Sequence, residues 1–257
     1  MAMFVGLIDG DGYFDIGEQK QQSRKGESRP STIRIRLAIN LASVDLPLLK
    51  YIQSVLGCGV ISIMPNGQYR LVFYKPDLLT IIFPLMRKFN LSFLVSSTLT
   101  QFNFIMFILD NDIVKWDKIG RSRSEFAPTK SLTYMEYVGL PQFKNWVVGF
   151  SIAEGSFSMK ANGDGFYSIR QTGALNLEVI KAIQFLLLGE LRSKIKPDSA
   201  NSYKLHISAR ADVQLVINFF SFSGLHPLIG NKASQYNIWI GRFKLSSRYG
   251  HLNFPPV

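Results

Sequence analysis

Two short stretches of the sequence end in an acidic residue followed by glycine, and these acids could do chemistry. The first stretch reads FVGLIDGDGYF and places Asp11 after its apolar part, and the second reads WVVGFSIAEGSF and places Glu154 there. Each stretch is apolar enough to predict a buried helix. Carboxylates at the ends of two such helices are unusual, because charged groups normally lie away from an apolar surface.

Small residues are spaced one helical turn apart in both stretches. Gly6 and Gly10 have the spacing i, i+4, and Gly149 and Ala153 repeat it, so each pair lies on one face of its helix. Helices with such faces can approach each other very closely. We therefore expect the two helices to pack along these faces and to bring their C-terminal acids side by side.

Two carboxylates that meet at helix C-termini create an electrostatic problem, which a cation would relieve. Helix C-termini carry partial negative charge and unpaired carbonyl groups, and neighbouring carboxylates repel each other. The carboxylates of Asp11 and Glu154, with the carbonyl groups of Gly10 and Ala153, form the oxygen-rich ligand set that Mg²⁺ prefers. Such a site can activate water and stabilise a phosphoryl transition state. One Asp-Gly pair is typical of a turn, but two copies in matching positions favour the metal site.

The composition limits the classes of protein to consider. The 257 residues carry a net charge of +11, and 47% of them are hydrophobic, which predicts a globular chain with an anionic partner, nucleic acid first. Cys58 is a single cysteine, so an internal disulfide and a cysteine-based zinc site are excluded. The histidines, His206, His226 and His251, lack the close spacing of zinc ligands. The sequence contains neither an apolar run long enough to span a membrane nor a secretion signal.

The same order of helices and strands is predicted twice along the chain. The patterns indicate an α+β protein with an α-β-β-α-β-β-α half in residues 1–112 and another in residues 143–257. Residues 113–142 are polar, basic and loop-like, and we interpret them as a linker. A helix that ends at a glycine is expected over residues 46–57. A hairpin with Asn-Gly at its turn is expected over residues 60–74.

The segments FVGLIDGDG and VVGFSIAEG resemble the two signature motifs of the LAGLIDADG homing endonucleases in their single-chain form. The second motif is degenerate, but it stands in register and ends in Ala-Glu-Gly. The resemblance covers essentially the whole chain and implies two pseudo-symmetric halves, each with a curved antiparallel sheet, packed through the motif helices into a DNA-binding saddle. It also implies a monomer with internal pseudo-twofold symmetry that straddles double-stranded DNA.

The resemblance assigns roles to the residues around the two acids. It makes Asp11 and Glu154 the metal ligands, with Gly10 and Ala153 beside them. It implies two or three divalent cations, Mg²⁺ in this interpretation, shared at the interface of the motif helices. Asp9 then caps or packs at the end of its helix and takes no part in catalysis.

Lys232 and Gln171 are further candidates for catalytic residues that orient water and stabilise charge. Residues 91–102 align without gaps with residues 225–236, and Lys232 then falls opposite Thr98. Related enzymes commonly place a basic residue about here, next to the scissile phosphate, where its charge lowers the cost of the transition state. Because the second half alone supplies one, we expect the two DNA strands to be cut at different rates.

Alternating residues in the predicted strands form two polar and basic faces that would contact DNA. A β-ribbon fits the major groove, where Arg and Lys can read guanine and Gln and Asn can read adenine, while other contacts bind phosphate alone. The candidate DNA-binding residues are Asp15, Gln19, Gln21, Arg34, Arg36, Asn40, Gln68 and Arg70 in the first half, and Ser158, Lys160, Asn162, Arg170, Lys194, Lys196, Lys204 and His206 in the second.

The sequence therefore predicts a site-specific homing endonuclease that makes a metal-dependent double-strand break in a long, nearly palindromic DNA target. Two alternatives stay open. One is an intron maturase of the same fold, which binds intron RNA and can also be a nuclease, and the other is a non-catalytic DNA-binding regulator. The intact acids favour the nuclease. Residues with A/T-rich codons are plentiful, and together with the family resemblance they indicate a mitochondrial location. No membrane partner is expected.

Overall fold

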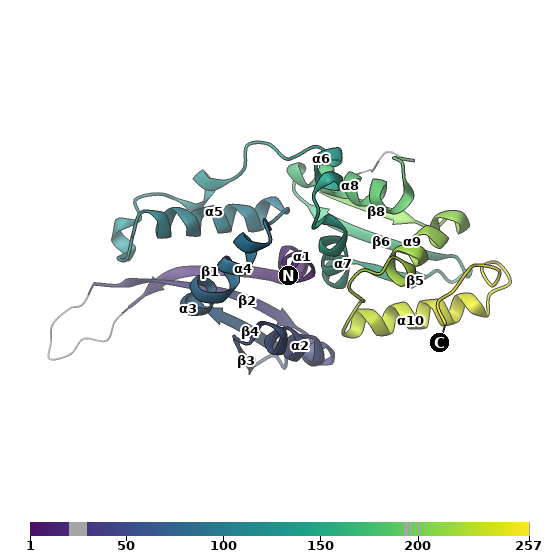
Figure 1. Cartoon of the computed structure of the whole chain (residues 1–257), viewed down its shortest axis with the longest axis horizontal. Coiled ribbons are helices and arrows are strands. Elements are labelled where there is room, and N and C mark those ends of the chain that lie inside the picture. Colours follow the sequence, from purple (N-terminus) through teal and green to yellow (C-terminus); the bar gives the residue numbers. More distant parts are fainter. Residues whose placement is uncertain (21–29, 193–194, 196, 200, 257) are drawn as a thin grey trace. The chain divides into compact units, whose positions relative to one another are not determined.

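The computed structural model describes residues 1–20, 30–192, 195, 197–199 and 201–256 (Figure 1). Within these residues the strands form two four-stranded antiparallel sheets, with the orders β1-β2-β4-β3 and β5-β6-β8-β7. Corresponding strands hold corresponding places in the two sheets. The predicted α+β class and the predicted internal repeat are therefore confirmed.

The first sheet follows helix α1 (Ala2–Asp11) without a loop. Its strands are β1 (Gly12–Gln19), β2 (Thr32–Leu41), β3 (Val60–Ile63) and β4 (Tyr69–Tyr74). Strand β2 alternates apolar and polar residues, so Ile33, Ile35 and Leu37 are buried on one face while Arg34 and Arg36 lie on the other. The alternation thus divides the sheet into a core face and a polar outer face.

Helices of the first half cover the core face of this sheet. They are α2 (Leu46–Leu56), α3 (Lys75–Asp77), α4 (Phe83–Lys88) and α5 (Ser96–Asp110), with the 3₁₀ turn η1 (Ser43–Asp45) and the π-helical turn η2 (Leu78–Ile82). Helix α2 ends where Gly57 adopts a left-handed conformation with a φ of 69°, as only glycine does readily. The hairpin over residues 60–74 is also present, with Gly67 at a φ of 80° in its turn. Both predictions are confirmed.

The second sheet repeats the strand order of the first. Its strands are β5 (Ser156–Met159), β6 (Gly165–Thr172), β7 (Pro197–Ser199) and β8 (Ser202–Ile207). In β8, Leu205 and Ile207 are buried, whereas Lys204 and His206 are exposed. This sheet therefore has a core face and a polar outer face as well.

The second half supplies its own set of covering helices. They are α6 (Tyr134–Gly139), α7 (Phe143–Glu154), α8 (Leu177–Leu188), α9 (Arg210–Phe222) and α10 (Asn231–Lys244), with the 3₁₀ turn η5 (Ala174–Asn176) between β6 and α8. The 3₁₀ turns η3 (Trp116–Lys118) and η4 (Arg123–Phe126) come before them in the chain and contact β1 and α5 of the first half. Helix α8 contacts β6 and β8, α9 contacts β6, and α10 contacts β5. Among the residues described, no helix is long and apolar enough to cross a membrane.

Helices α1 and α7 pack backbone against backbone along their small residues. A Cβ atom on Gly6 would stand 2.0 Å from the carbonyl oxygen of Trp146, and one on Gly149 would stand 1.8 Å from the carbonyl oxygen of Met3. A real Cβ atom cannot approach an oxygen so closely, so each position needs glycine. The predicted packing of the two small-residue faces is confirmed.

The chain divides into two compact units, one made of Met1–Gly10 with Lys130–Val257 and the other of Asp11–Thr129. Helix α1 therefore belongs, apart from its last residue, to the unit that contains α7 and the second sheet. The boundaries of the two halves and of the linker given above stay predictions.

The predicted linker is not loop-like throughout, because it contains helix α6. The backbone nitrogen of Tyr134 donates to Glu178 Oε2 at 2.9 Å, and the rings of Tyr134 and Phe185 lie 5.6 Å apart, so α6 packs against α8. The loop interpretation was wrong for Tyr134–Gly139, because a helix of six residues shows too little periodicity to be recognised. Its start is marked by a capping box, Thr133-x-x-Glu136, which is a readable sequence signal.

Candidate active site and nucleic-acid interface

The two acids of the first motif have different surroundings. Asp9 is 3% exposed and accepts a hydrogen bond of 2.8 Å from Trp146 Nε1. Asp11 is partly exposed and is the last residue of α1. The prediction that Asp9 packs at the helix end is confirmed, and Asp11 is left as the acid of this motif that faces solvent.

Glu154 ends α7 as Asp11 ends α1, and its side chain lies beside the end of α1. A Cβ atom on Gly10 would stand 2.3 Å from Ala153 Cβ and 3.2 Å from Glu154 Cγ. Glu154 is partly exposed, like Asp11. The residues that sequence analysis proposed around the acids, Gly10 and Ala153, therefore pack against each other.

The ligands that this region offers to a metal are oxygen atoms. Across the described part of the chain, no three side chains of His, Cys, Asp or Glu group closely enough to hold a metal ion. A cation bound by one or two carboxylates needs further oxygen ligands. Mg²⁺ commonly takes these ligands from substrate phosphates and water.

Lys232 reaches the second motif from helix α10. Its side chain is half-buried, and Nζ donates a hydrogen bond to the carbonyl oxygen of Gly155, the residue after Glu154. The structure thus brings this predicted residue next to the second acid in the chain.

The matching place in the first half has no basic residue. Thr98, which aligns with Lys232, is 3% exposed in α5. Three residues further along this helix, Gln101 Oε1 accepts a hydrogen bond of 2.8 Å from the backbone nitrogen of Phe14. The residues that align with each other thus differ in chemistry, since Thr98 is neutral and buried and Lys232 is cationic and bonds to Gly155.

Gln171 lies on the core side of β6 and not on its polar outer side. It pairs with Tyr203 in the register of β6 and β8, as Ile169 pairs with Leu205. Its Oε1 accepts a hydrogen bond of 2.8 Å from the backbone nitrogen of Thr172. This placement gives the predicted catalytic role of Gln171 no support.

Asp15, Arg34 and Arg36 form one cluster on the outer face of the first sheet. Arg34 Nε and Nη2 donate to the two carboxylate oxygens of Asp15 at 3.2 and 3.1 Å, and Arg36 Nε donates to Oδ2 at 3.0 Å. Burial raises the pKa of Asp15, but the hydrogen bonds from the two arginines outweigh it, so the net pKa is lowered. Asp15 is therefore ionised at neutral pH and binds both arginines.

A second polar group follows on the same face. Arg70 Nε donates to Asn40 Oδ1 at 2.9 Å, and Asn40 Nδ2 donates to the hydroxyl of Tyr13 at 3.3 Å. Gln68 lies in the β3–β4 turn, where it exchanges hydrogen bonds with Asn66. Sequence analysis missed Tyr13, although its place two residues before Asp15 puts it on the same face of β1.

The outer face of the second sheet carries basic residues of β6 and β8. Arg170 pairs with Lys204 and Ser168 with His206 in the register of β6 and β8. Arg170 Nε donates to Ser202 Oγ at 2.6 Å. Burial lowers the pKa of His206, and the charges of nearby lysines lower it further, which favours the neutral imidazole.

An aromatic residue on this face was not predicted. Phe166 pairs with Ser158 in the register of β5 and β6 and its ring centroid lies 4.6 Å from that of His206. The ammonium of Lys160 lies 6.0 Å from the Phe166 ring centroid. Alternation along β6 places Phe166 on the outer face, because the next residue, Tyr167, is buried.

The β5–β6 turn of the second sheet is held by its own side chains. Asn162 Nδ2 donates to Asp164 Oδ2 at 3.0 Å, and Arg248 pairs with Asp164.

Gln19 of the first sheet is exposed at the end of β1. Three other candidate DNA-binding residues, Gln21, Lys194 and Lys196, lie outside the described residues.

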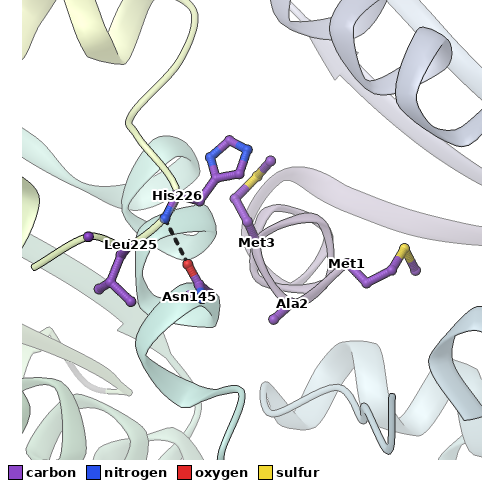
Figure 2. Close-up of a pocket in the computed structure, with 7 residues that line it drawn as sticks. Met1, Ala2, Met3, Asn145, Leu225 and His226 are labelled. Atoms are coloured by element: carbon purple, nitrogen blue, oxygen red, sulfur yellow. Dashed lines mark hydrogen bonds between the residues drawn. The ribbon is translucent and has the colours of Figure 1, made fainter. Parts of the chain in front are cut away.

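A pocket of about 360 Å³ opens at the other end of α1 (Figure 2). The backbone nitrogen of His226 donates to Asn145 Oδ1 at 2.9 Å within it. Its lining includes Met1 and Met3, at the start of a helix whose last residue is Asp11. The pocket is therefore separate from the acidic ends of the motif helices.

Comparisons with known proteins agree with this geometry. Residues 4–107 match the family described as LAGLIDADG endonuclease. A probable intron-encoded endonuclease, aI3 of Dictyostelium discoideum, is 21% identical over 235 residues, which cover 90% of this chain and 92% of that protein.

Solved structures of meganucleases share the fold of the chain. I-CpaMI bound to uncleaved DNA has a TM-score of 0.71 at 19% identity, over 98% of this chain and 93% of that one. I-LtrWI bound to target DNA has a TM-score of 0.71 at 19% identity, over 98% and 92%. I-SmaMI bound to uncleaved DNA with calcium ions has a TM-score of 0.68 at 18% identity, over 98% and 93%. The predicted fold is confirmed by these likenesses.

Proposed function

Because residues 4–107 match the LAGLIDADG endonuclease family, we propose that the chain is a site-specific homing endonuclease that cuts double-stranded DNA. The observation that carries the proposal is the matched pair of acidic helix ends, Asp11 on α1 and Glu154 on α7, where Gly10 packs on Ala153. The net charge of +11 favours a polyanionic partner. The meganucleases that share the fold were crystallised with DNA.

In this proposal Asp11 and Glu154 hold divalent cations, with the carbonyl oxygens of Gly10 and Ala153 beside them. The all-oxygen ligand set fits Mg²⁺, and phosphate oxygens of the DNA would complete the coordination of two or three ions. When bound, such ions supply the Lewis acid that polarises the scissile phosphate. The calcium ions present with I-SmaMI and DNA support a divalent metal.

Lys232 contributes a fixed positive charge in the second half. Its Nζ bonds to the carbonyl oxygen of Gly155, and its positive charge would stabilise negative charge that develops on a nearby phosphate. The hydrogen bond to Gly155 holds the side chain in place before the DNA arrives, so little reorganisation is needed.

The outer faces of the two sheets are the proposed DNA-binding surfaces. Arginines and lysines there neutralise phosphates, and those held by neighbouring side chains read base edges in the major groove. A monomer with two sheets of the same strand order suits a long and nearly palindromic target, because each sheet contacts one half-site.

Intron RNA is the partner that an alternative function, an intron maturase, would use. The relative from Dictyostelium discoideum is named as intron-encoded, and a basic surface binds RNA as well as DNA. The same relative, with the residues of A/T-rich codons in the sequence, supports a mitochondrial location. A non-catalytic regulator would not need to keep both acids.

One selection experiment tests the endonuclease and separates it from these alternatives. The protein is incubated with a library of randomised DNA duplexes and Mg²⁺, with EDTA in a parallel reaction, and the cut ends are sequenced. We expect one long sequence, cut in both strands, in the Mg²⁺ reaction alone. Binding of intron RNA without cleavage of any duplex would favour the maturase, and binding of one duplex without cleavage would favour the regulator.

A further inference from the structure

One carboxylate binds two arginines on the outer face of the first sheet. Asp15 lies opposite Arg36 in the register of β1 and β2, and Arg34 lies opposite Gly17. Both arginines turn toward Asp15 and bond to it through Nε and Nη2. Their side chains are 35% and 28% exposed, and that of Asp15 is 25% exposed. The cluster is thus partly shielded from water but reachable from the face of the sheet.

Glycine makes room for this arrangement. A Cβ atom on Gly17 would stand 2.8 Å from Arg34 Nη2, so Arg34 crosses the strand above a residue with no side chain. The guanidinium therefore reaches Asp15 at a close distance. The position of Arg34 is fixed on one side by the carboxylate and below by the backbone of β1.

The bonds to Asp15 leave one edge of the guanidinium groups free to act. A guanidinium has five N–H donors, and the cluster uses those on Nε and one on Nη2. Arg36 Nη1 makes no hydrogen bond to any residue that the structure describes, and Arg34 Nη1 makes a long one of 3.4 Å to the carbonyl oxygen of Glu18. Two parallel donors on Nη1 and Nη2 are the group that reads O6 and N7 of guanine.

The carboxylate also lowers the attraction of the arginines for phosphate. A free arginine on a long side chain bonds to whichever phosphate is near, which adds affinity but no sequence information. The negative charge of Asp15 cancels one of the two positive charges and repels phosphate. The carboxylate repels a neutral base edge much less than a charged phosphate, so the cluster favours bases over the backbone of DNA.

The second sheet lacks this device at the corresponding place. Counting from the glycine after each motif, Ser158 takes the position of Asp15, and its register partner is Phe166 where Asp15 has Arg36. A hydroxyl and an aromatic ring replace the acid and the arginine. At this aligned position the bonded acid and arginine pair is therefore found in the first sheet and not in the second.

We propose that Asp15 is a specificity-determining positioning residue: it holds Arg34 and Arg36 so that they read guanine in the half-site under the first sheet instead of binding phosphate. The inference rests on the proposed DNA-binding function and adds the chemistry of one half-site. Asp15 acts through the arginines and need not touch DNA.

Asp15→Asn tests this directly, since asparagine keeps the size of the side chain and removes its charge. Binding is measured without Mg²⁺ to duplexes that carry single base-pair changes in the selected target, and to a random duplex, over a range of salt concentrations. We expect the preference for guanine in one half-site to fall about tenfold. We expect affinity for the random duplex to rise, with a salt slope steeper by about 0.9 for each new phosphate contact.

Two further variants separate positioning from charge. Glu190→Gln removes an exposed carboxylate that pairs with Arg192 away from the strands, so it matches the change in net charge and should leave base preference unchanged. Arg36→Lys keeps the charge but loses the two parallel donors. Arg36→Lys should lower the guanine preference without steepening the salt slope. If Asp15→Asn does not fold, this variant tests whether Arg36 reads guanine.

Several results would overturn the inference. One is a guanine preference that survives both Asp15→Asn and Arg36→Lys. Another is a loss of affinity for the random duplex in an Asp15→Asn variant that folds. A wild-type protein that binds its target but shows no guanine preference in either half-site would refute the inference and leave the endonuclease intact. A wild-type protein that binds no duplex would refute the proposed function itself.

Discussion

Asp9 and Asp11 stand two residues apart in one motif, and burial separates their roles. Asp9 is 3% exposed and accepts a hydrogen bond from Trp146, so its carboxyl group serves the packing of α1 on α7. Asp11 ends the helix and is partly exposed, where its carboxylate can bind a cation. Two aspartates of one motif thus differ in what they can bind, because Asp9 is buried against Trp146 and Asp11 is partly exposed.

Replacing either of the acids that end the motif helices should stop cleavage and spare DNA binding. Asp11→Asn and Glu154→Gln keep the size of the side chain but remove the charge that holds a cation. We expect target affinity within a few-fold of wild type and loss of double-strand cleavage in gel assays. Asp110→Asn is a matched control, since Asp110 also ends a helix, α5, and is exposed. Normal cleavage by both motif variants would refute the metal assignment.

The sequence singles out the two acids that end the motif helices more readily than the contacts of the outer sheet face. Asp11 and Glu154 follow from a repeated motif, which needs no three-dimensional information. The bonds of Asp15 to two arginines depend on the pairing register of β1 and β2, which alternation within each strand cannot supply. Gln171 is different, because alternation from the buried Tyr167 and Ile169 already places it on the core side of β6.

The two motif helices depend on glycine where their backbones meet. Gly149→Ala would place a methyl group about where the carbonyl oxygen of Met3 lies, so α1 and α7 must move apart. We expect the free energy of unfolding to fall by about 2 kcal/mol or more, measured by chemical denaturation followed by circular dichroism.

A second helical glycine provides the control for this substitution. Gly241 lies within α10, and a Cβ atom there would meet no atom within 4 Å among those described. Gly241→Ala should leave stability unchanged or raise it by up to about 1 kcal/mol, since alanine is the better helix former. Equal effects of Gly149→Ala and Gly241→Ala would show that close packing of the motif helices is not what holds them.

The order of helices and strands was predictable because apolar residues recur at regular helical or strand spacing in both halves. Helix α2 and the β3–β4 hairpin had clear end and turn signals in their glycines. Helix α6 was missed, since a helix of six residues offers less than two turns of periodicity. Its stability comes from packing on α8, a tertiary contact that local sequence does not reveal.

At the scale of the whole molecule, the charge should make DNA binding strongly dependent on salt. Each phosphate that a lysine or arginine neutralises releases counterions, with a slope of about −0.9 in log K against log salt. We expect a slope of about −6 or steeper for the target, measured by fluorescence anisotropy. A nearly flat salt dependence would mean that phosphate contacts contribute little to affinity and would contradict the proposed surfaces.

The two halves share strand order but not the chemistry at matching positions, and this should appear as unequal cutting of the two DNA strands. Lys232 donates to the carbonyl oxygen of Gly155 beside the second acid, whereas Thr98 holds the aligned place in the first half and is buried. If Lys232 acts at the scissile phosphate as proposed, the second half has a cation at this position to stabilise the transition state, where the first half has a threonine. On supercoiled plasmid that carries the target, we expect an open-circular intermediate to accumulate before the linear product.

Lys232→Met should remove this difference by slowing the faster strand, about tenfold or more, as expected for the loss of one charged group that stabilises the transition state. The measurement uses duplexes labelled on each strand in turn, so that two rate constants are obtained. Lys244→Met is the control, because Lys244 lies at the other end of α10 and bonds to the carbonyl oxygen of Pro255. It removes the same charge and should leave both rates unchanged. Equal strand rates in the wild type, together with no effect of Lys232→Met on either strand, would show that the asymmetry of the sequence has no catalytic consequence.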